Sequence, residues 1–128
     1  MKLLLDTHTL LWWRDNPAEL SAVSLTALRD SSNTLFLSMV SLWELQIKVG
    51  LNKLSVSVSI SEMVRQEVEV NGMQLLPIAL DHIYALSSLP HHHRDPFDRL
   101  LIAQAQVEGA TLVTKDHLIA LYSIPTLW

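Results

Sequence analysis

Short apolar runs of strand length, separated by longer stretches with helical patterning, constrain this chain more than any other feature. The runs at residues 2–6, 34–38, 73–78 and 110–114 are expected to be buried strands, because they have strand length. The first two end at a polar residue, and a glycine precedes each of the other two. Residues 121–125 are expected to add a short edge strand, a position where Pro125 is tolerated.

Helices are expected between these strands. They cover residues 21–29, 41–49, 60–70, 80–89 and 96–108. Gly50, Gly72 and Gly109 lie just after three of them, where a helix commonly ends in a glycine. Strands that alternate with helices predict an α/β fold, namely a three-layer α/β/α sandwich around a mostly parallel sheet of four to five strands.

Length and composition predict one domain that spans residues 1–128 and lies in the cytoplasm. Hydrophobic residues make up 49% of the chain and charged residues 17%, which excludes a disordered tail. The absence of cysteine excludes disulfides, thiolate zinc sites and thiol nucleophiles, and fits a reducing compartment. No apolar stretch approaches the ~18 residues of a membrane span, and Asp6 interrupts the apolar start too early for a secretory signal.

The formal charge of −4 argues against a nucleic-acid binder that relies on a broad basic face. Thirteen acidic residues stand against nine basic ones. If four carboxylates gather at one metal site, the remaining acids balance the bases, and the rest of the surface is neutral. A bound cation would then supply positive charge locally.

Acidic residues fall where a parallel sheet binds its ligands, beyond the carboxyl ends of the strands. Asp6 ends the first expected strand, Glu44 lies in the first turn of the helix after the second, and Asp116 follows residues 110–114. Asp98 joins them if the helix that begins at Pro96 starts on the same rim. Such carboxylates repel one another unless a cation neutralises them. Oxygen ligands without cysteine favour Mg²⁺ or Mn²⁺, which can activate water for attack on a phosphodiester.

Each acid also has a purely structural interpretation. Ser41 and Glu44 match a capping box, in which Glu44 reaches back to the Ser41 N–H. Asp95 followed by Pro96 is typical of a helix N-cap, which would leave Asp98 as the third helical residue. Asp6 and Asp116 each match a turn residue. The convergence of the acids, rather than any one position, favours a metal site.

At these residues the chain resembles the PIN-domain nucleases, and in particular the VapC-like toxins of bacterial toxin–antitoxin pairs. The resemblance is carried by Leu3-Leu4-Leu5-Asp6-Thr7-His8, Ser41-Leu42-Trp43-Glu44, His93-Arg94-Asp95-Pro96-Phe97-Asp98-Arg99 and Leu112-Val113-Thr114-Lys115-Asp116. It covers essentially the full length.

The resemblance implies metal-dependent cleavage of RNA, with Mg²⁺ or Mn²⁺ held by four acids. These are Asp6, Glu44, Asp98 and Asp116. Small polar groups near the metal water are expected at Thr7, Ser38 and Thr114, and Asp95 is a weaker ligand candidate. The resemblance also implies a protein antitoxin as partner and a homodimer.

Several other residues are candidates for contact with RNA. His8, His93 and Arg94 lie next to the expected site, and Arg99 either pairs with a site carboxylate or reaches the scissile phosphate. Adjacent histidines on a loop point in different directions, so residues 91–93 favour a solvated loop over a zinc site. The tryptophans at positions 12, 13 and 43 favour packing over base stacking, and an exposed aromatic patch would indicate a protein interface.

Two rival functions remain open from the sequence. A phosphatase would use Asp6 as nucleophile, although His8 stands where the Asp-x-Asp motif of haloacid-dehalogenase-like phosphatases has its second acid. A non-catalytic binding module would use the acids only as helix caps and turn residues. Saturable stabilisation by Mg²⁺ separates the module from the nuclease.

Overall fold

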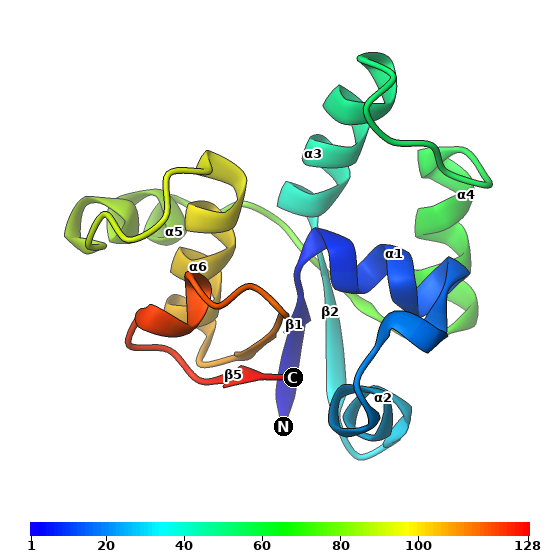
Figure 1. Ribbon diagram of the computed structural model, residues 1–128, viewed down its shortest axis with the longest axis horizontal. Helices are drawn as coiled ribbons and strands as arrows, with labels where there is room; N and C mark the ends of the chain where they lie inside the picture. Colours follow the sequence, from blue (N-terminus) through cyan, green and yellow to red (C-terminus); the bar gives the residue numbers. More distant parts are fainter.

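The computed structural model describes residues 1–128 and contains one sheet of five strands, all parallel, in the order β3-β2-β1-β4-β5 (Figure 1). The strands are β1 Lys2–Leu5, β2 Thr34–Ser38, β3 Gln74–Leu76, β4 Thr111–Val113 and β5 Thr126–Leu127. Leu4 of the central strand pairs with Phe36 on one side and Leu112 on the other. The predicted α/β fold with a parallel sheet is confirmed.

Helices connect the strands. They are α1 Thr7–Asp15, α2 Ala22–Arg29, α3 Met39–Gly50, α4 Ile60–Val64, α5 Leu80–Ala85 and α6 Pro96–Glu108. A π-helix, η2 Arg65–Val70, continues α4, and 3-10 turns occupy η1 Pro17–Glu19, η3 Leu86–Ser88 and η4 Ile119–Leu121. None of these helices combines the length and apolar character required to cross a membrane.

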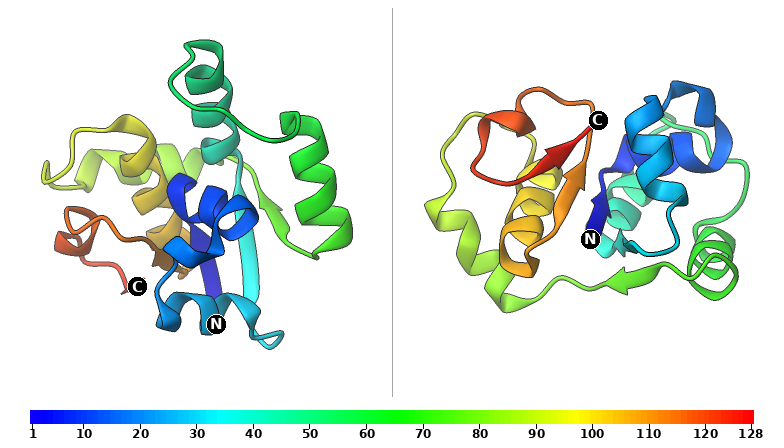
Figure 2. Two further views of the ribbon diagram at one scale, coloured as in Figure 1. Left: turned by 45° about the vertical axis from the view of Figure 1, so that its right-hand side comes forward. Right: turned by 90° about the horizontal axis from the view of Figure 1, so that it is seen from below.

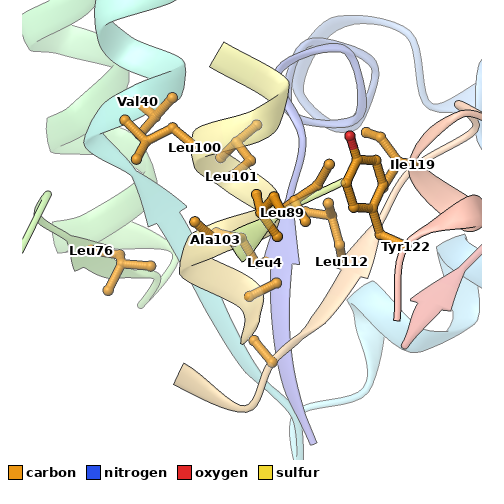
Figure 3. Close-up of a cluster of buried hydrophobic side chains, with 13 residues drawn as sticks. Leu4, Val40, Leu76, Leu89, Leu100, Leu101, Ala103, Leu112, Ile119 and Tyr122 are labelled. Carbon is orange, nitrogen blue, oxygen red and sulfur yellow. The ribbon is translucent and has the colours of Figure 1, made fainter. Parts of the chain in front are cut away.

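Two hydrophobic cores lie on opposite faces of the sheet, because successive residues of a strand point to opposite sides. Leu4 packs with residues of α6, including Leu101 and Ile102, as Figure 3 shows in part. Leu3 and Leu5 pack instead with residues of α1, α2 and α4. In Figures 1 and 2, α5 and α6 accordingly lie on one side of the strands and α1, α2 and α4 on the other. This is the predicted three-layer arrangement.

Helix α1 is absent from the helices expected from the sequence. Its residues include threonines and tryptophans, which have modest helix propensity, so the local pattern did not indicate it. Asp6 provides the missing signal, because its side chain accepts a hydrogen bond from the Thr9 N–H at 2.8 Å and caps the helix.

The expected edge strand at residues 121–125 is wrong. The 3-10 turn η4 ends at Leu121, residues 122–125 form no strand, and β5 begins only after Pro125, which has no N–H to donate to a ladder. The Pro125 carbonyl still accepts a hydrogen bond from the Leu112 N–H at 3.0 Å, so the proline leads the chain onto the sheet edge.

Helix α3 differs from expectation at both ends. It begins at Met39, with Ser38 as its N-cap, so Glu44 lies beyond the first turn and the predicted capping box between Ser41 and Glu44 does not form. Gly50 is the last helical residue rather than the residue after the helix, and positive φ occurs at Asn52 instead. At Gly109 the prediction is confirmed, because this residue ends α6 with φ 64°.

Candidate metal centre

The helices α1, α3 and α6 all begin at the carboxyl end of the sheet, which is the upper end in Figure 1. Each carries one or more predicted acids in or next to its first turns, and Asp116 follows β4 at the same end. Parallel strands bring their carboxyl ends to one rim, so segments far apart in the sequence meet there.

Asp6 is buried at the junction of β1 and α1. While one carboxylate oxygen caps α1, the other accepts a hydrogen bond from the Thr114 hydroxyl at 2.5 Å. Burial raises the pKa of Asp6, and the hydrogen bonds from Thr114 and Thr9 oppose that rise. The N-cap role and a metal-binding role are therefore compatible at this residue, because the hydrogen bonds fix the direction of its carboxylate.

Glu44 is also buried, with 3% of its surface exposed, on the face of α3 turned toward α1. The Thr7 hydroxyl donates to its Oε1 at 2.6 Å, and the Lys48 ammonium forms an ion pair with its Oε2. Thr7 thus contacts a predicted ligand, as expected for a small polar group at the site.

Lys48 was not among the predicted site residues. Its hydrogen bond with Glu44 raises its pKa, and the charges of Asp95 and Asp98 add to that effect. The spacing of four residues between Glu44 and Lys48 was the signal that could have identified it, because side chains so spaced are neighbours on a helix.

Asp95 and Asp98 lie at the start of α6. Asp95 is the N-cap, and its side chain accepts hydrogen bonds from the N–H groups of Phe97 and Asp98 at 2.8 and 3.2 Å. Its predicted structural role is therefore confirmed. This leaves Asp98 as the third helical residue, free to face the rim.

Asp98 is an acid of the site whose pKa is strongly raised. Burial raises its pKa to about 7, and the negative charges of Asp95, Asp6 and Glu44 add to the rise, opposed by the adjacent His93 ring. Oδ1 of Asp98 accepts no hydrogen bond from the protein.

Asp116 lies in the turn after β4, held by the Thr114 hydroxyl, which accepts from its N–H at 3.0 Å. Its Oδ1 accepts from the Leu118 N–H at 2.8 Å, so Asp116 does act as a turn residue. Its partial burial would raise the pKa of the carboxyl, but hydrogen bonds from His93 and Leu118 lower it overall.

His93 occupies a position that the sequence did not predict. Its Nε2 lies 2.8 Å from Oδ2 of Asp116 and 3.1 Å from Oδ2 of Asp98. These three side chains form a group whose potential ligand atoms all lie within 4.8 Å of one another. Asp6 and Glu44 are not part of this group, and the Thr114 hydroxyl, which contacts Asp6, also accepts from the Asp116 N–H. His93 was expected as a substrate contact, but its ring faces the acids.

The remaining predicted residues divide into two groups. His8 and Arg94 are exposed at the rim, as contacts with RNA require. The Arg99 guanidinium does not form the expected pair with a site carboxylate; it donates to the Pro90 carbonyl and the Tyr122 hydroxyl at 2.8 and 3.2 Å. Its expected contact with the scissile phosphate stays a prediction. Ser38 also differs from expectation, since its hydroxyl donates to Gln104 at 2.5 Å rather than pointing to the acids.

The tryptophans behave differently from one another. Trp12 and Trp13 pack against the core beside α2 and α4, as predicted. Trp43 is half exposed, and its ring packs edge-to-face on Phe97 with centroids 4.9 Å apart. It belongs to an exposed apolar row on α3 whose members are spaced four residues apart. The row consists of Met39, Trp43, Ile47 and Leu51.

The donor set fits a divalent metal ion. Its carboxylates come from four segments of the chain, and the only basic side chain paired with one of the four predicted acids other than His93 is Lys48, which binds Glu44. Burial and the charge of Asp95 are the largest causes of the raised pKa of Asp98, and a bound cation would offset both. Hard oxygen donors in this number match Mg²⁺ or Mn²⁺.

Comparison with known proteins agrees with this geometry. The family model described as PIN domain matches residues 3–123. The chain belongs to the PIN-domain family. This PIN domain is 29% identical to Ribonuclease VapC22 of Mycobacterium tuberculosis over 98% of both chains.

Two solved structures share the fold of this PIN domain. The first is the crystal structure of VapBC2 from Rickettsia felis bound to a DNA fragment from their promoter, with a TM-score of 0.67 and 18% identity over 98% of this chain and 97% of that one. The second is FitAcB from Neisseria gonorrhoeae, with a TM-score of 0.59 and 17% identity over 97% of this chain and 95% of that one.

Proposed function

We propose that this chain, as a single PIN domain, is a metal-dependent endoribonuclease and the toxin of a toxin–antitoxin pair. The gathering of acids at the carboxyl end of the sheet, with Asp98 and Asp116 in one tight group, carries the proposal, because carboxylates brought together repel one another unless a cation binds there. Membership of the PIN family and the similarity to Ribonuclease VapC22 support RNA as the substrate.

Asp6, Glu44, Asp98 and Asp116 are the proposed ligands of Mg²⁺ or Mn²⁺. When bound, the ion would activate a water for attack on phosphorus and balance the charge that develops on the phosphodiester. The chain itself orients the carboxylates: the hydroxyl groups of Thr7 and Thr114 each donate to one acid. These contacts match the preorganisation that in-line attack requires, because the ligands need not move to bind.

His8 and Arg94 are the proposed contacts for RNA. Both are exposed beside the acids, where a cation or ring N–H can meet a phosphate. Lys48 is a further candidate, since its ammonium neutralises Glu44 at the edge of the site and retains 28% exposure.

Cleavage of RNA by purified, antitoxin-free protein tests the function. Wild-type protein should cleave total RNA with Mg²⁺ or Mn²⁺ and not with a chelator, and Asp98→Asn should lose more than about a hundredfold in rate. Asp81→Asn, which removes an exposed acid of α5, is the matched control and should cleave as the wild type does. Full activity of Asp98→Asn would contradict the assignment.

The aspartyl-phosphatase alternative has less support. Membership of the PIN family and the similarity to Ribonuclease VapC22 favour a nuclease, and His8 stands where the phosphatase motif has its second acid. A phosphoenzyme trapped with labelled substrate would restore it. The binding-module alternative predicts no saturable stabilisation of the protein by Mg²⁺ or Mn²⁺.

A protein antitoxin is the proposed partner of this PIN domain. The resemblance to VapC-like toxins supports it, as does the shared fold with the VapBC2 structure. Co-expression with the protein encoded beside this chain should yield a stable complex in which RNA cleavage is suppressed. Independent purification of the two proteins with no effect on cleavage would contradict the proposal.

A homodimer is also proposed, and the exposed row on α3 supports it, because such an apolar stripe is typical of a helix that packs on another. Ile47→Asp should convert the dimer to a monomer in sedimentation equilibrium. Val23→Asp, at an exposed apolar residue of α2, is the control and should leave the dimer intact. A wild-type monomer at all concentrations would contradict the proposal.

A further inference from the structure

The His93 ring lies between two of the proposed metal ligands, and its role rests on the proposed metal site. Its Nε2 contacts Oδ2 of both Asp98 and Asp116, at 3.1 and 2.8 Å. With 8% of its surface exposed, the residue is buried. Two roles would explain the position: a nitrogen ligand that joins the acids on the ion, or a hydrogen-bond donor that orients them.

The other ring nitrogen decides between these roles. Nδ1 of His93 accepts a hydrogen bond from the Asp95 N–H at 3.1 Å. An acceptor nitrogen carries no proton, so the neutral ring must carry its proton on Nε2. A metal-binding imidazole needs a free lone pair on the coordinating nitrogen and usually donates from the other one. In His93 the lone pair faces Asp95, and the N–H faces the two carboxylates.

The backbone of His93 is held in place independently of the acids. The Tyr122 hydroxyl accepts from the His93 N–H at 2.9 Å and donates to the Pro90 carbonyl at 2.8 Å. Arg99 donates to the same hydroxyl and carbonyl, which ties the loop to α6. These contacts restrict a rotation of the loop that would present a different nitrogen to the acids.

We propose that His93 is a positioning residue that acts through Asp98 and Asp116 and does not itself bind the metal. Its Nε2–H donates to Oδ2 of Asp116 at 2.8 Å, and the same nitrogen lies 3.1 Å from Oδ2 of Asp98. Oδ1 of Asp98, which accepts no hydrogen bond from the protein, is left free for the ion. A histidine that donates to ligating carboxylates plays the part that outer hydrogen-bond partners play around many metal ions.

Nitrogen NMR of the histidine rings tests the tautomer directly in the wild-type protein. We expect His93 to carry its proton on Nε2 both in the metal-free protein and after saturation with Mg²⁺. A change to the Nδ1–H tautomer on addition of Mg²⁺ would overturn the proposal. So would nitrogen coupling from a directly bound imidazole in the pulsed EPR spectrum of the Mn²⁺-loaded protein.

Substitutions separate donation from coordination in a second way. His93→Gln places an amide N–H near the position of Nε2 and should keep the Mg²⁺ affinity within about threefold, whereas His93→Leu should lower it about 10- to 100-fold. Affinities are measured by calorimetry, with circular dichroism to verify folding. Equal losses in both variants would contradict donation by Nε2–H.

The outcomes distinguish this inference from the proposed function. If the wild-type protein binds neither Mg²⁺ nor Mn²⁺ saturably, the metal site itself is wrong and the role of His93 fails with it. If the protein binds the ion but His93 changes tautomer or coordinates it, only the positioning role fails.

Discussion

Two buried carboxylates in different regions of the molecule have contrasting neighbours. Glu67, near the amino-terminal ends of β2 and β3, is 3% exposed and pairs with the Arg14 guanidinium at 2.6 Å. Asp98, at the opposite end of the sheet, lies among other acids with the His93 ring as its nearest polar partner. The fold therefore places an arginine beside Glu67, which has a structural role. It places no arginine or lysine in contact with Asp98, where we propose that a metal binds.

Removal of the cation at Glu67 is the largest expected effect on stability. Arg14→Met keeps much of the side-chain volume but leaves Glu67 buried without its ion pair, so the free energy of unfolding should fall by about 3–5 kcal/mol. Urea denaturation measures the change. Arg29→Met removes an exposed arginine that borders the same hollow and serves as the control. Equal stability of the two variants would show that the ion pair of Arg14 with Glu67 does not stabilise the fold.

Removal of the charge at Asp98 should instead raise the free energy of unfolding of the metal-free protein. Burial raises its pKa to about 7 in the folded protein from 3.8, so the folded state binds more protons than the unfolded state between these values. Without metal, this carboxyl therefore makes stability fall as the pH rises through that range. At about pH 8, Asp98→Asn should stabilise the metal-free protein by on the order of 2 kcal/mol, allowing for partial exposure to solvent.

The same comparison at about pH 3 is the internal control, because Asp98 is then largely protonated in both states and the substitution should change little. Thermal or urea unfolding of both proteins at the two pH values provides the measurement. If Asp98→Asn is less stable than the wild type at the higher pH, the proposed difference between the surroundings of Glu67 and Asp98 is contradicted.

Removal of the exposed ion pair between Arg65 and Glu62 should have the smallest effect on stability. The Arg65 hydrogen bond lowers the pKa of Glu62, yet both side chains lie open to solvent, where ion pairs contribute little. Arg65→Ala should leave the urea midpoint unchanged. A loss comparable with that of Arg14→Met would mean that burial is not what distinguishes these pairs.

Where local chemistry determines an element, the sequence was sufficient to predict it. Asp95 and Pro96 start α6 at the predicted residue, because an N-cap acceptor and a proline at the first helical position act within one turn. The placement of Asp6, Glu44, Asp98 and Asp116 at one end followed from the geometry of parallel strands.

Long-range contacts were beyond the reach of the sequence. The Glu44 carboxylate accepts from Thr7, 37 positions away in the chain, and this tertiary contact replaces the local capping box that the sequence favoured. His93 reaches Asp116 because Tyr122, which lies 29 positions after it, holds its loop. No periodicity or spacing encodes such partners.

Titration of metal-free protein with Mn²⁺, followed by calorimetry, tests the central claim most directly. The account predicts one saturable process in the wild type and in Asp81→Asn, and its loss in Asp98→Asn. It also predicts that saturating ion raises the free energy of unfolding of the wild type, by about 2.7 kcal/mol at a hundred times the dissociation constant. Wild-type protein that shows no saturable binding, or Asp98→Asn that binds equally well, would contradict the account.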